Sequence, residues 1–438
     1  MSNRSPGSRW VTLWTLLVPA FAATGVQAQR LIDIPDGDRA LNLNAEQVYS
    51  VGSMMGDEWE TFGEVGSVAF DAEGNLYILD AQSHRVVVVD SEGNFLREFG
   101  KEGDGPGELR FPRDLVVTPD GIVAVRDMGH QALVLFESNG TYLHNARNDF
   151  QTGLLGGDLW YHPSGGVVGA SMGVSVRAGP GGTVTSGGGT TTPVKLVPFT
   201  ENSESEILYE AWRLPPEEAS GGGMSFSSGG GGGIRLQGMS AARAFEPPLL
   251  TGVLPEGRVV LADSTDYSIK LLTADGTLDA VLRRSFEPRA VTRRDREAEK
   301  ARRIEDLDSG GGAGGAVMMI RGGGSGGGGS STTSIGGDAM SDMMRDRIEN
   351  MVFAEEVPVL SALAVDWEGR LWVQRTGDRV GEDGPTDLVT ADGQYLGSIP
   401  ADGLRIPDAF GPDGLIANIE TDEFDVPTVV VQRLPAVH

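Results

Sequence analysis

The stretch Val68-Ala-Phe-Asp-Ala-Glu-Gly74-Asn-Leu-Tyr-Ile-Leu-Asp80 joins two short apolar runs through an acidic turn that ends in glycine. Glycine supplies the positive φ that a tight hairpin needs, and a preceding acidic residue suits the same turn. The stretch therefore predicts two antiparallel strands. Related stretches follow at 115–127, 160–165, 253–257, 364–369 and 410–414. Six copies of one hairpin predict a repeat architecture.

A second hairpin follows most copies of the first. It is clearest in Arg85-Val-Val-Val-Val-Asp-Ser-Glu-Gly93, and similar segments begin at Ala132, Ile269 and Thr386. Each unit then holds four antiparallel strands in about 40 residues, which is the size of a propeller blade. The long gaps between later turn glycines coincide with low-complexity tracts, which favours six blades over a larger number. We predict an all-β, six-bladed β-propeller that forms a single domain over residues 29–438.

The two ends of the chain predict how the ring closes. The last repeat stops one strand short, and a lone strand, Gln47–Gly52, precedes the first repeat. Pairing Gln47–Gly52 with Thr428–Arg433 completes the sixth blade and removes an open sheet edge, a frequent arrangement in β-propellers.

The same segments carry a family resemblance. Gly74–Asp80, Ser83-His-Arg-Val86, Gly103-Asp-Gly-Pro-Gly-Glu-Leu109 and Phe111-Pro112 resemble the NHL-repeat class of six-bladed β-propellers. The resemblance covers 62–147, 245–285 and 357–434, whereas 150–245 departs from the pattern. The class includes extracellular lactonases, amidating lyases, ligand-binding sensors and exported proteins, so the resemblance implies the fold rather than one activity.

Glycine is concentrated in three inserts. Of the 64 glycines, 28 lie in residues 179–189, 221–233 and 310–337, a composition typical of flexible coil that forms no strands. The first tract separates the second and third strands of blade 3, and the others link blades 3 and 4 and blades 4 and 5. In a four-stranded blade these connections share one side of the disc. We call that side the insertion face and the opposite side, which has short turns, the plain face.

The largest insert, 288–356, is predicted to be partly helical. Thr292-Arg-Arg-Asp295 is a variant of the capping box, and 293–307 lacks glycine and proline, so a charged helix is expected there. A second helix is expected over Ala339–Phe353, where methionine and isoleucine recur at helical spacing. Either the two helices lie across the propeller with their apolar sides inward, or they form a lid that binds a partner or ligand.

Composition restricts the compartment and the partners. With 62 acidic and 35 basic residues the formal charge is −27, which disfavours nucleic acid and anionic lipid as partners. The absence of cysteine excludes disulfides and thiolate sites. Residues 1–28 have a basic start, an apolar run and Val26-Gln27-Ala28, the form of a secretory signal peptide. We therefore expect a periplasmic or secreted monomer without a membrane span after signal removal.

No catalytic or metal-binding motif is evident. The five histidines fall on different turns and strands, so they are not expected to converge on a metal, and no cofactor is predicted. Calcium is the alternative that the resemblance implies, because lactonases of this class bind it at the channel mouth through acidic and amide ligands. Asp80, His84, Arg85 and Asp127 are expected to hold the second-to-third turns together.

Arginine and aromatic side chains near the blade links are the predicted binding residues, since they commonly anchor binding surfaces; methionine adds an adaptable apolar contact. The set is Trp59, Arg110, Arg113, Arg294 and Met344. The sequence thus favours a non-catalytic propeller that binds a ligand or protein partner through the insertion face. The alternative is a calcium-dependent, lactonase-like hydrolase or lyase at the channel mouth.

Overall fold

The computed structural model describes residues 29–147, 155–171, 175–178, 184–187, 191–201, 204–213, 225–228, 234–237, 242–309, 337–421 and 426–436. The predicted signal peptide, most of the third glycine tract and parts of the other two lie outside these residues.

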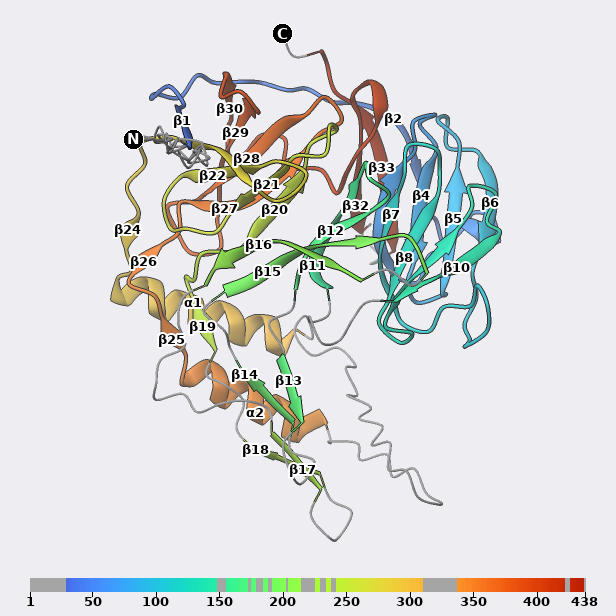
Figure 1. The fold of residues 1–438 in the computed structure, drawn as a ribbon, viewed down its shortest axis with the longest axis horizontal. Helices are drawn as coiled ribbons and strands as arrows, with labels where there is room; N and C mark the ends of the chain where they lie inside the picture. The colour runs from blue at the N-terminus through green and yellow to red at the C-terminus, as the bar shows by residue number, and fades with distance from the viewer. Residues whose placement is uncertain are drawn as a thin grey trace, which may run out of the picture.

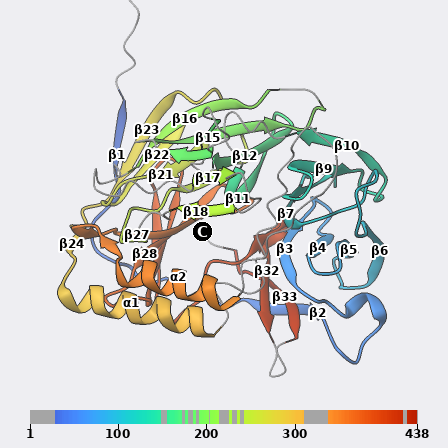
Figure 2. The same ribbon diagram turned by 90° about the horizontal axis from the view of Figure 1, so that it is seen from below.

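Six antiparallel sheets surround a common centre, which confirms the predicted propeller (Figures 1 and 2). Blades 1 to 3 are β3 Val65–Phe70, β4 Leu76–Asp80, β5 Arg85–Val89 and β6 Phe95–Phe99; β7 Pro112–Val117, β8 Val123–Asp127, β9 Ala132–Phe136 and β10 Tyr142–Arg147; and β11 Leu155–His162, β12 Gly166–Ser171, β15 Thr191–Pro198 and β16 Glu206–Trp212. Blades 4 to 6 are β20 Leu250–Val253, β21 Val259–Ala262, β22 Ser268–Leu272 and β23 Leu278–Arg283; β27 Leu360–Val365, β28 Arg370–Thr376, β29 Asp383–Thr390 and β30 Tyr395–Ile399; and β31 Ala409–Phe410, β32 Leu415–Thr421 and β33 Pro427–Arg433.

The core lies between neighbouring blades. Along β5, Val86 and Val88 pack in the cluster shared with blade 2, whereas Val87 and Val89 pack in the cluster shared with blade 6. Successive side chains of a strand point to opposite faces of its sheet, so a strand covered on both sides reads as a continuous apolar run. Gly74, with φ 81°, turns the chain between β3 and β4, as the hairpin pattern predicts.

The N-terminal segment closes the ring, and we call residues 30–51 the strap. Strand β2, Glu46–Val51, pairs antiparallel with β33, with Tyr49 opposite Val431 and Val51 opposite Val429. The predicted closure is therefore confirmed. Strand β1, Arg30–Asp33, was not predicted and adds to blade 4 parallel to β23. Between the two strands, Leu41 and Arg39 form backbone hydrogen bonds with Ser398 of blade 5, so the strap joins three blades.

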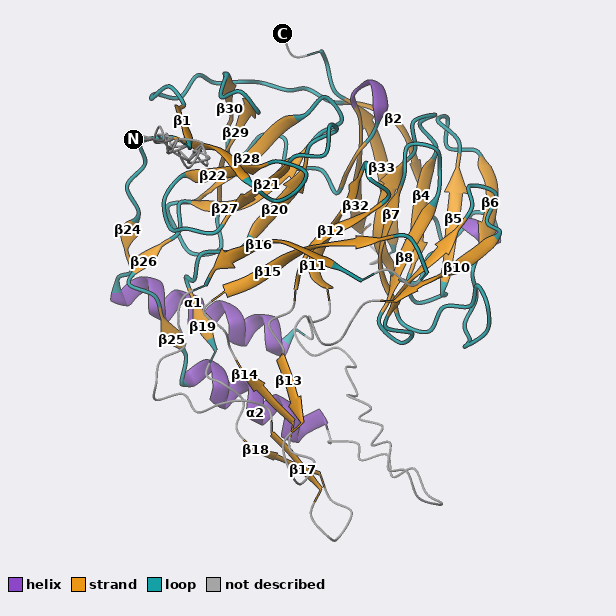
Figure 3. Cartoon of the chain, in the orientation of Figure 1, coloured by secondary structure: helices purple, strands orange, loops and turns teal. Residues whose placement is uncertain are grey.

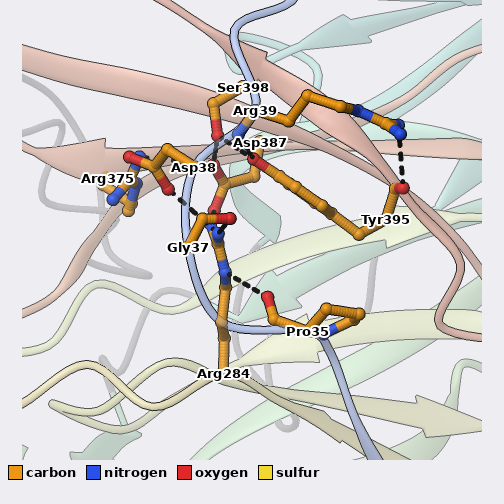
Figure 4. A network of polar contacts seen from close by, with 9 residues as sticks. All are labelled: Pro35, Gly37, Asp38, Arg39, Arg284, Arg375, Asp387, Tyr395 and Ser398. Atoms are coloured by element: carbon orange, nitrogen blue, oxygen red, sulfur yellow. Dashed lines mark hydrogen bonds and ion pairs between the residues drawn. The ribbon is translucent and has the colours of Figure 1, made fainter.

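A buried ionic network fastens the strap to blades 4 and 5 (Figure 4). The side chains of Arg284 and Asp387 are both fully buried, and their ion pair measures 2.8 Å. Arg284 also donates to the backbone carbonyl oxygens of Pro35 and Gly37 and pairs with Asp38 at 2.9 Å. Arg375 reaches the other carboxylate oxygen of Asp38 at 2.7 Å. Every charge in the network thus has an opposite partner, which a buried charge requires.

The inserts form a separate layer on the insertion face, below the propeller in Figures 1 and 3. Strands β13 Ser175–Ala178 and β14 Val184–Gly187, from the first insert, form one sheet with β17 Ser225–Ser228 and β18 Ile234–Gln237, from the second. The expectation of coil without strands is therefore wrong for 184–187 and 225–228. These glycine-rich tracts contain β-forming residues, namely Val184 and Thr185 in the first and Phe226 in the second.

The third insert contains both predicted helices. Helix α1 spans Arg293–Asp308 and begins at Thr292 with a complete capping box, as expected. Helix α2 spans Gly337–Glu349 and ends four residues before the predicted limit. Residues 352–353, which were predicted to be helical, instead form strand β25, Val352–Phe353. This strand pairs with β19, Arg243–Ala244, from the second insert.

Helix α1 packs Ile304 and Leu307 against a buried cluster, but it also buries charged side chains, which the alternative with apolar sides inward did not foresee. Its buried residues are Asp295 and Glu299. Glu299 pairs with Arg303 at 2.6 Å and with Arg302 at 3.0 Å, and a hydrogen bond from Arg289 lowers the pKa of Asp295 to about 2. Arginine partners therefore let the helix bury two carboxylates.

Candidate ligand site in the central channel

The described residues form a central channel with a volume of about 760 Å³. All six inner strands line it: β3, β7, β11, β20, β27 and β31. Each inner strand enters from a blade link, so its first residues lie at the insertion face and its last residues at the plain face. We call the first end the channel mouth and the second the channel base.

The channel base is mostly apolar, and the charged residue in its described lining, Asp366, pairs with Arg370 at 2.6 Å. Its lining includes the final or penultimate residues of the inner strands, namely Phe70, Val117, Tyr161, Val253, Val365 and Phe410. Trp367 adds an aromatic ring beyond β27, and its indole nitrogen donates to the carbonyl oxygen of Phe410 at 2.7 Å. An apolar ligand part in contact with these side chains is removed from water, which favours binding.

Charged side chains gather at the mouth where blades 1, 2 and 3 meet. Asp114 of β7 accepts a hydrogen bond from the Ser67 hydroxyl at 2.7 Å and lies 3.5 Å from the guanidinium of Arg126 on β8. Arg126 also donates to the carbonyl oxygen of Gly157 on blade 3, at 2.8 Å. This chain of contacts fixes the side chains of three blades relative to one another.

Irregular strand pairing presents these residues to the channel. The register of the inner strands shifts between Val65 and Ser67, between Pro112 and Asp114, and between Gly156 and Trp160. Bulges of this kind bend a strand and redirect side chains, and they are frequent beside functional sites. In blade 5 the corresponding register shift lies between Leu360 and Ala362. The side chain of Ala362 is small and therefore occupies little of the channel.

Electrostatics distinguish Asp114 from the other mouth residues. Burial raises the pKa of its carboxyl group and the negative charge of Asp158 raises it further, whereas Arg126 and the Ser67 hydroxyl lower it, leaving the pKa above the usual value. Asp158 and Asp383 also line the channel, and neither has an ion pair within the described part of the chain. On the opposite side of the mouth, Arg405 lies 3.8 Å from Asp408.

This raised pKa predicts a specific pH effect on stability. Because the folded protein holds the Asp114 proton more tightly than the unfolded chain, ionisation costs stability as pH rises from the usual carboxyl range, about 3.9, towards the raised value. Compared with Asp114→Asn, the wild type should lose free energy of unfolding over that range, as measured by urea denaturation at successive pH values. Asp158→Asn should shrink the difference by removing the nearby charge. A wild-type advantage that grows with pH would contradict the raised pKa.

Of the five predicted binding residues, only Arg113 lines the channel. It stacks on Phe111, with 4.0 Å between the guanidinium carbon and the ring centre, and lies 3.8 Å from Glu64. Trp59 packs against Phe95 with ring centres 5.2 Å apart, and Arg110 pairs with Asp104 at 2.6 Å. Arg294 is exposed on α1, and Met344 on α2 lines a second cavity.

The residues expected to hold turns lie at the insertion face. The Asp80 carboxylate accepts hydrogen bonds from the backbone nitrogens of Gly63 and Ser83 and lies 3.3 Å from Arg85. Asp127 accepts from the backbone nitrogens of Arg110 and His130 in the same way in blade 2.

His84 occupies a turn position with φ 57°. Within the described residues no group of three or more histidine, cysteine or acidic side chains is arranged to share a metal ion.

The spacing of the repeats contains a signal for the mouth residues. Ser67, Asp114, Asp158 and Ala362 each stand seven residues before a turn glycine, namely Gly74, Gly121, Gly165 and Gly369. Aligning the repeats on these glycines places the four residues at one level of the ring. Arg126 stands where blade 1 has Leu79, and an arginine inside an apolar strand points to a buried polar contact.

Comparison with known proteins agrees with the fold. Residues 57–163 match a family model described as a 6-bladed beta-propeller. A 67-residue stretch is 31% identical to the E3 ubiquitin-protein ligase NHLRC1 of Homo sapiens, covering 15% of this chain and 17% of that protein. Another, of 107 residues, is 27% identical to the Protein brain tumor of Drosophila melanogaster and covers 24% of this chain and 9% of that protein. The chain therefore spans less than a fifth of either relative.

Among solved structures, a Bacteroides fragilis protein described as exported is 12% identical with a TM-score of 0.47, covering 93% of this chain and 100% of that one. The blades and the matched segments define the class of protein: a six-bladed β-propeller. Its repeats are NHL-like, as the sequence motifs predicted. None of the helices that the structure describes has the length and apolar character needed to cross a bilayer.

Proposed function

We propose that this protein is an exported binding protein that takes up a small amphipathic molecule through the insertion face and holds it in the central channel without transforming it. The observation that carries the proposal is the polarity gradient of the channel, from charged side chains at the mouth to aromatic and aliphatic side chains at the base. The volume of about 760 Å³ falls in the range of small-molecule sites, and an apolar wall with a few placed polar groups is typical of them.

The charges at the mouth indicate the polar end of the ligand. The guanidinium groups of Arg126 and Arg405 already face Asp114 and Asp408. Asp158 and Asp383 are exposed at the mouth, and neither carboxylate forms an ion pair with another described residue. An ammonium group, or another strong hydrogen-bond donor, would pair with these two carboxylates. The preferred ligand therefore combines such a donor with an apolar body that reaches Phe70 and Trp367.

The rival proposal is a calcium-dependent hydrolase or lyase at the mouth. Its support is Asp114, a carboxyl group whose raised pKa and contact with Ser67 suit a general acid. Binding remains the better-supported function, because the other carboxylates of the described mouth do not form a group that would share an ion.

Melting curves with calcium and with chelator separate the two proposals. A binding protein without a calcium site should melt at the same temperature in millimolar calcium and in EDTA, and should not hydrolyse lactones or p-nitrophenyl esters. A catalytic calcium site would stabilise the native state by ~2.7 kcal/mol at a hundred times its dissociation constant. A calcium-dependent rise of several degrees together with turnover that Asp114→Asn abolishes would overturn the binding proposal in favour of the enzyme.

A further inference from the structure

A second cavity lies in the insertion layer, away from the channel. It is an open pocket with a volume of about 550 Å³, and it is lined by residues of α1, α2 and the segment 242–246 and by Arg213 beyond β16. Five arginines line it against two acidic residues; the arginines are Arg213, Arg243, Arg302, Arg303 and Arg347. This is an unusual surplus of positive charge in a chain whose formal charge is −27.

The buried carboxylate of Glu299 positions two of the arginines. It pairs with Arg302 at 3.0 Å and with Arg303 at 2.6 Å, and its side chain is only 7% exposed. Arg303 also donates to the carbonyl oxygen of Arg243, at 3.1 Å. Guanidinium groups held in this way lose little freedom when an anion binds, which favours recognition of a carboxylate or similar group.

The acidic residues around the cavity leave Arg213 without a carboxylate within the described part of the chain. Glu246 pairs with Arg243 at 2.8 Å, and Asp306 pairs with Arg302 at 2.9 Å. Glu299 pairs with both Arg302 and Arg303, so these carboxylates are engaged with three of the arginines. Arg213 is half-buried and has no acidic partner in the described part of the chain. A ligand with one negative group would supply the partner that Arg213 lacks.

The rest of the wall is apolar. Ala242 and Ile348 are buried in a cluster that also includes Leu307, and Met344 completes the lining. The methionine side chain adapts easily to different apolar shapes. The cavity thus combines arginines with an apolar wall, and its volume lies within the range of small-molecule sites.

We propose that the cavity between α1 and α2 binds an organic anion that carries a single acidic group on an apolar body. This site is separate from the channel and prefers the opposite charge. The two proposals therefore stand or fall independently.

Binding of 1-anilinonaphthalene-8-sulfonate, whose fluorescence rises in apolar sites, tests this inference with the full mature chain. We expect saturable binding of one dye molecule per chain and displacement by laurate. Arg213→Glu should weaken dye binding at least tenfold, because it removes a charged hydrogen-bond donor and adds a repulsive carboxylate, an effect of about 1.4 kcal/mol or more. Met344→Glu, on a different segment, should have a similar effect. Arg213 and Met344 are both partly exposed, so neither substitution should prevent folding. Melting temperatures equal to that of the wild type would verify that both variants fold.

Two controls define the chemistry. Arg379→Glu makes the same charge change at an exposed residue outside both cavities and should bind the dye as the wild type does. Dodecyltrimethylammonium, with the same apolar chain length as laurate but a cationic head, should not compete. Three outcomes would each overturn the proposal. The cation could compete as well as laurate does, inorganic phosphate could compete as well as laurate does, or both Arg213→Glu and Met344→Glu could bind the dye as tightly as the wild type.

Discussion

Deleting residues 29–52 should abolish cooperative unfolding and cause the protein to aggregate. The deletion removes β2, which leaves the edge of β33 open, and an unpaired edge strand favours association with other chains. It also removes Asp38 and the carbonyl groups of Pro35 and Gly37, which accept hydrogen bonds from the buried Arg284. Differential scanning calorimetry and size-exclusion chromatography would measure the loss.

A shorter deletion provides the matched control. Removing residues 29–33 eliminates only β1 and leaves both β2 and the ionic network in place. This variant should therefore still unfold cooperatively. If the 29–52 deletion instead retained the wild-type melting temperature, the strap would not be what closes the ring.

Replacing Asp387 by alanine should cost about 3–5 kcal/mol of unfolding free energy, the range for breaking a buried ion pair. The cost arises because the fully buried guanidinium of Arg284 loses its fully buried partner. Figure 4 shows how closely this pair is surrounded by the strap and by blade 5. Asp38, whose side chain is 46% exposed, would remain as a weaker counter-charge. Chemical denaturation of the variant and the wild type measures the difference directly.

Asp279→Ala is the control, because it removes an exposed partner of Arg30. Exposed pairs contribute about 0–1 kcal/mol, so this change should be small. The double variant Arg284→Met with Asp387→Leu should lose less than Asp387→Ala, because it leaves no buried charge without a partner. A loss below about 1 kcal/mol for Asp387→Ala would show that the network contributes little to stability.

The sequence predicted the blades because their signals are local. A turn glycine such as Gly74 and the valine run 86–89 identify a hairpin without knowledge of the rest of the chain. Counting strands then predicted the pairing of β2 with β33. By contrast, Arg284 and Asp387 are 103 positions apart in the sequence, so no local sequence pattern predicts their contact.

The channel mouth was missed for a similar reason. Ser67, Asp114 and Asp158 come from three blades, and their common place at the mouth depends on bulges that alter the strict alternation of side chains. Trp59 and Arg110 were chosen by residue type, but the structure shows them engaged with Phe95 and Asp104. The layer on the insertion face depends on pairing between two inserts, which neither insert reveals alone.

Equilibrium binding of monodansylcadaverine to the mature protein tests the central proposal most directly. This probe joins an alkylammonium group to an apolar naphthalene ring, so it matches the mouth and base of the channel. Ala362→Trp places a large side chain among the residues that line the channel, whereas Ala401→Trp makes the same change in an exposed loop. Arg213→Glu serves as a second control in the other cavity.

We predict that the wild type, Ala401→Trp and Arg213→Glu bind one probe molecule per chain with equal affinity, and that Ala362→Trp binds it at least tenfold more weakly. Equal affinity of Ala362→Trp and the wild type, or no saturable binding by the wild type, would contradict a ligand site in the channel.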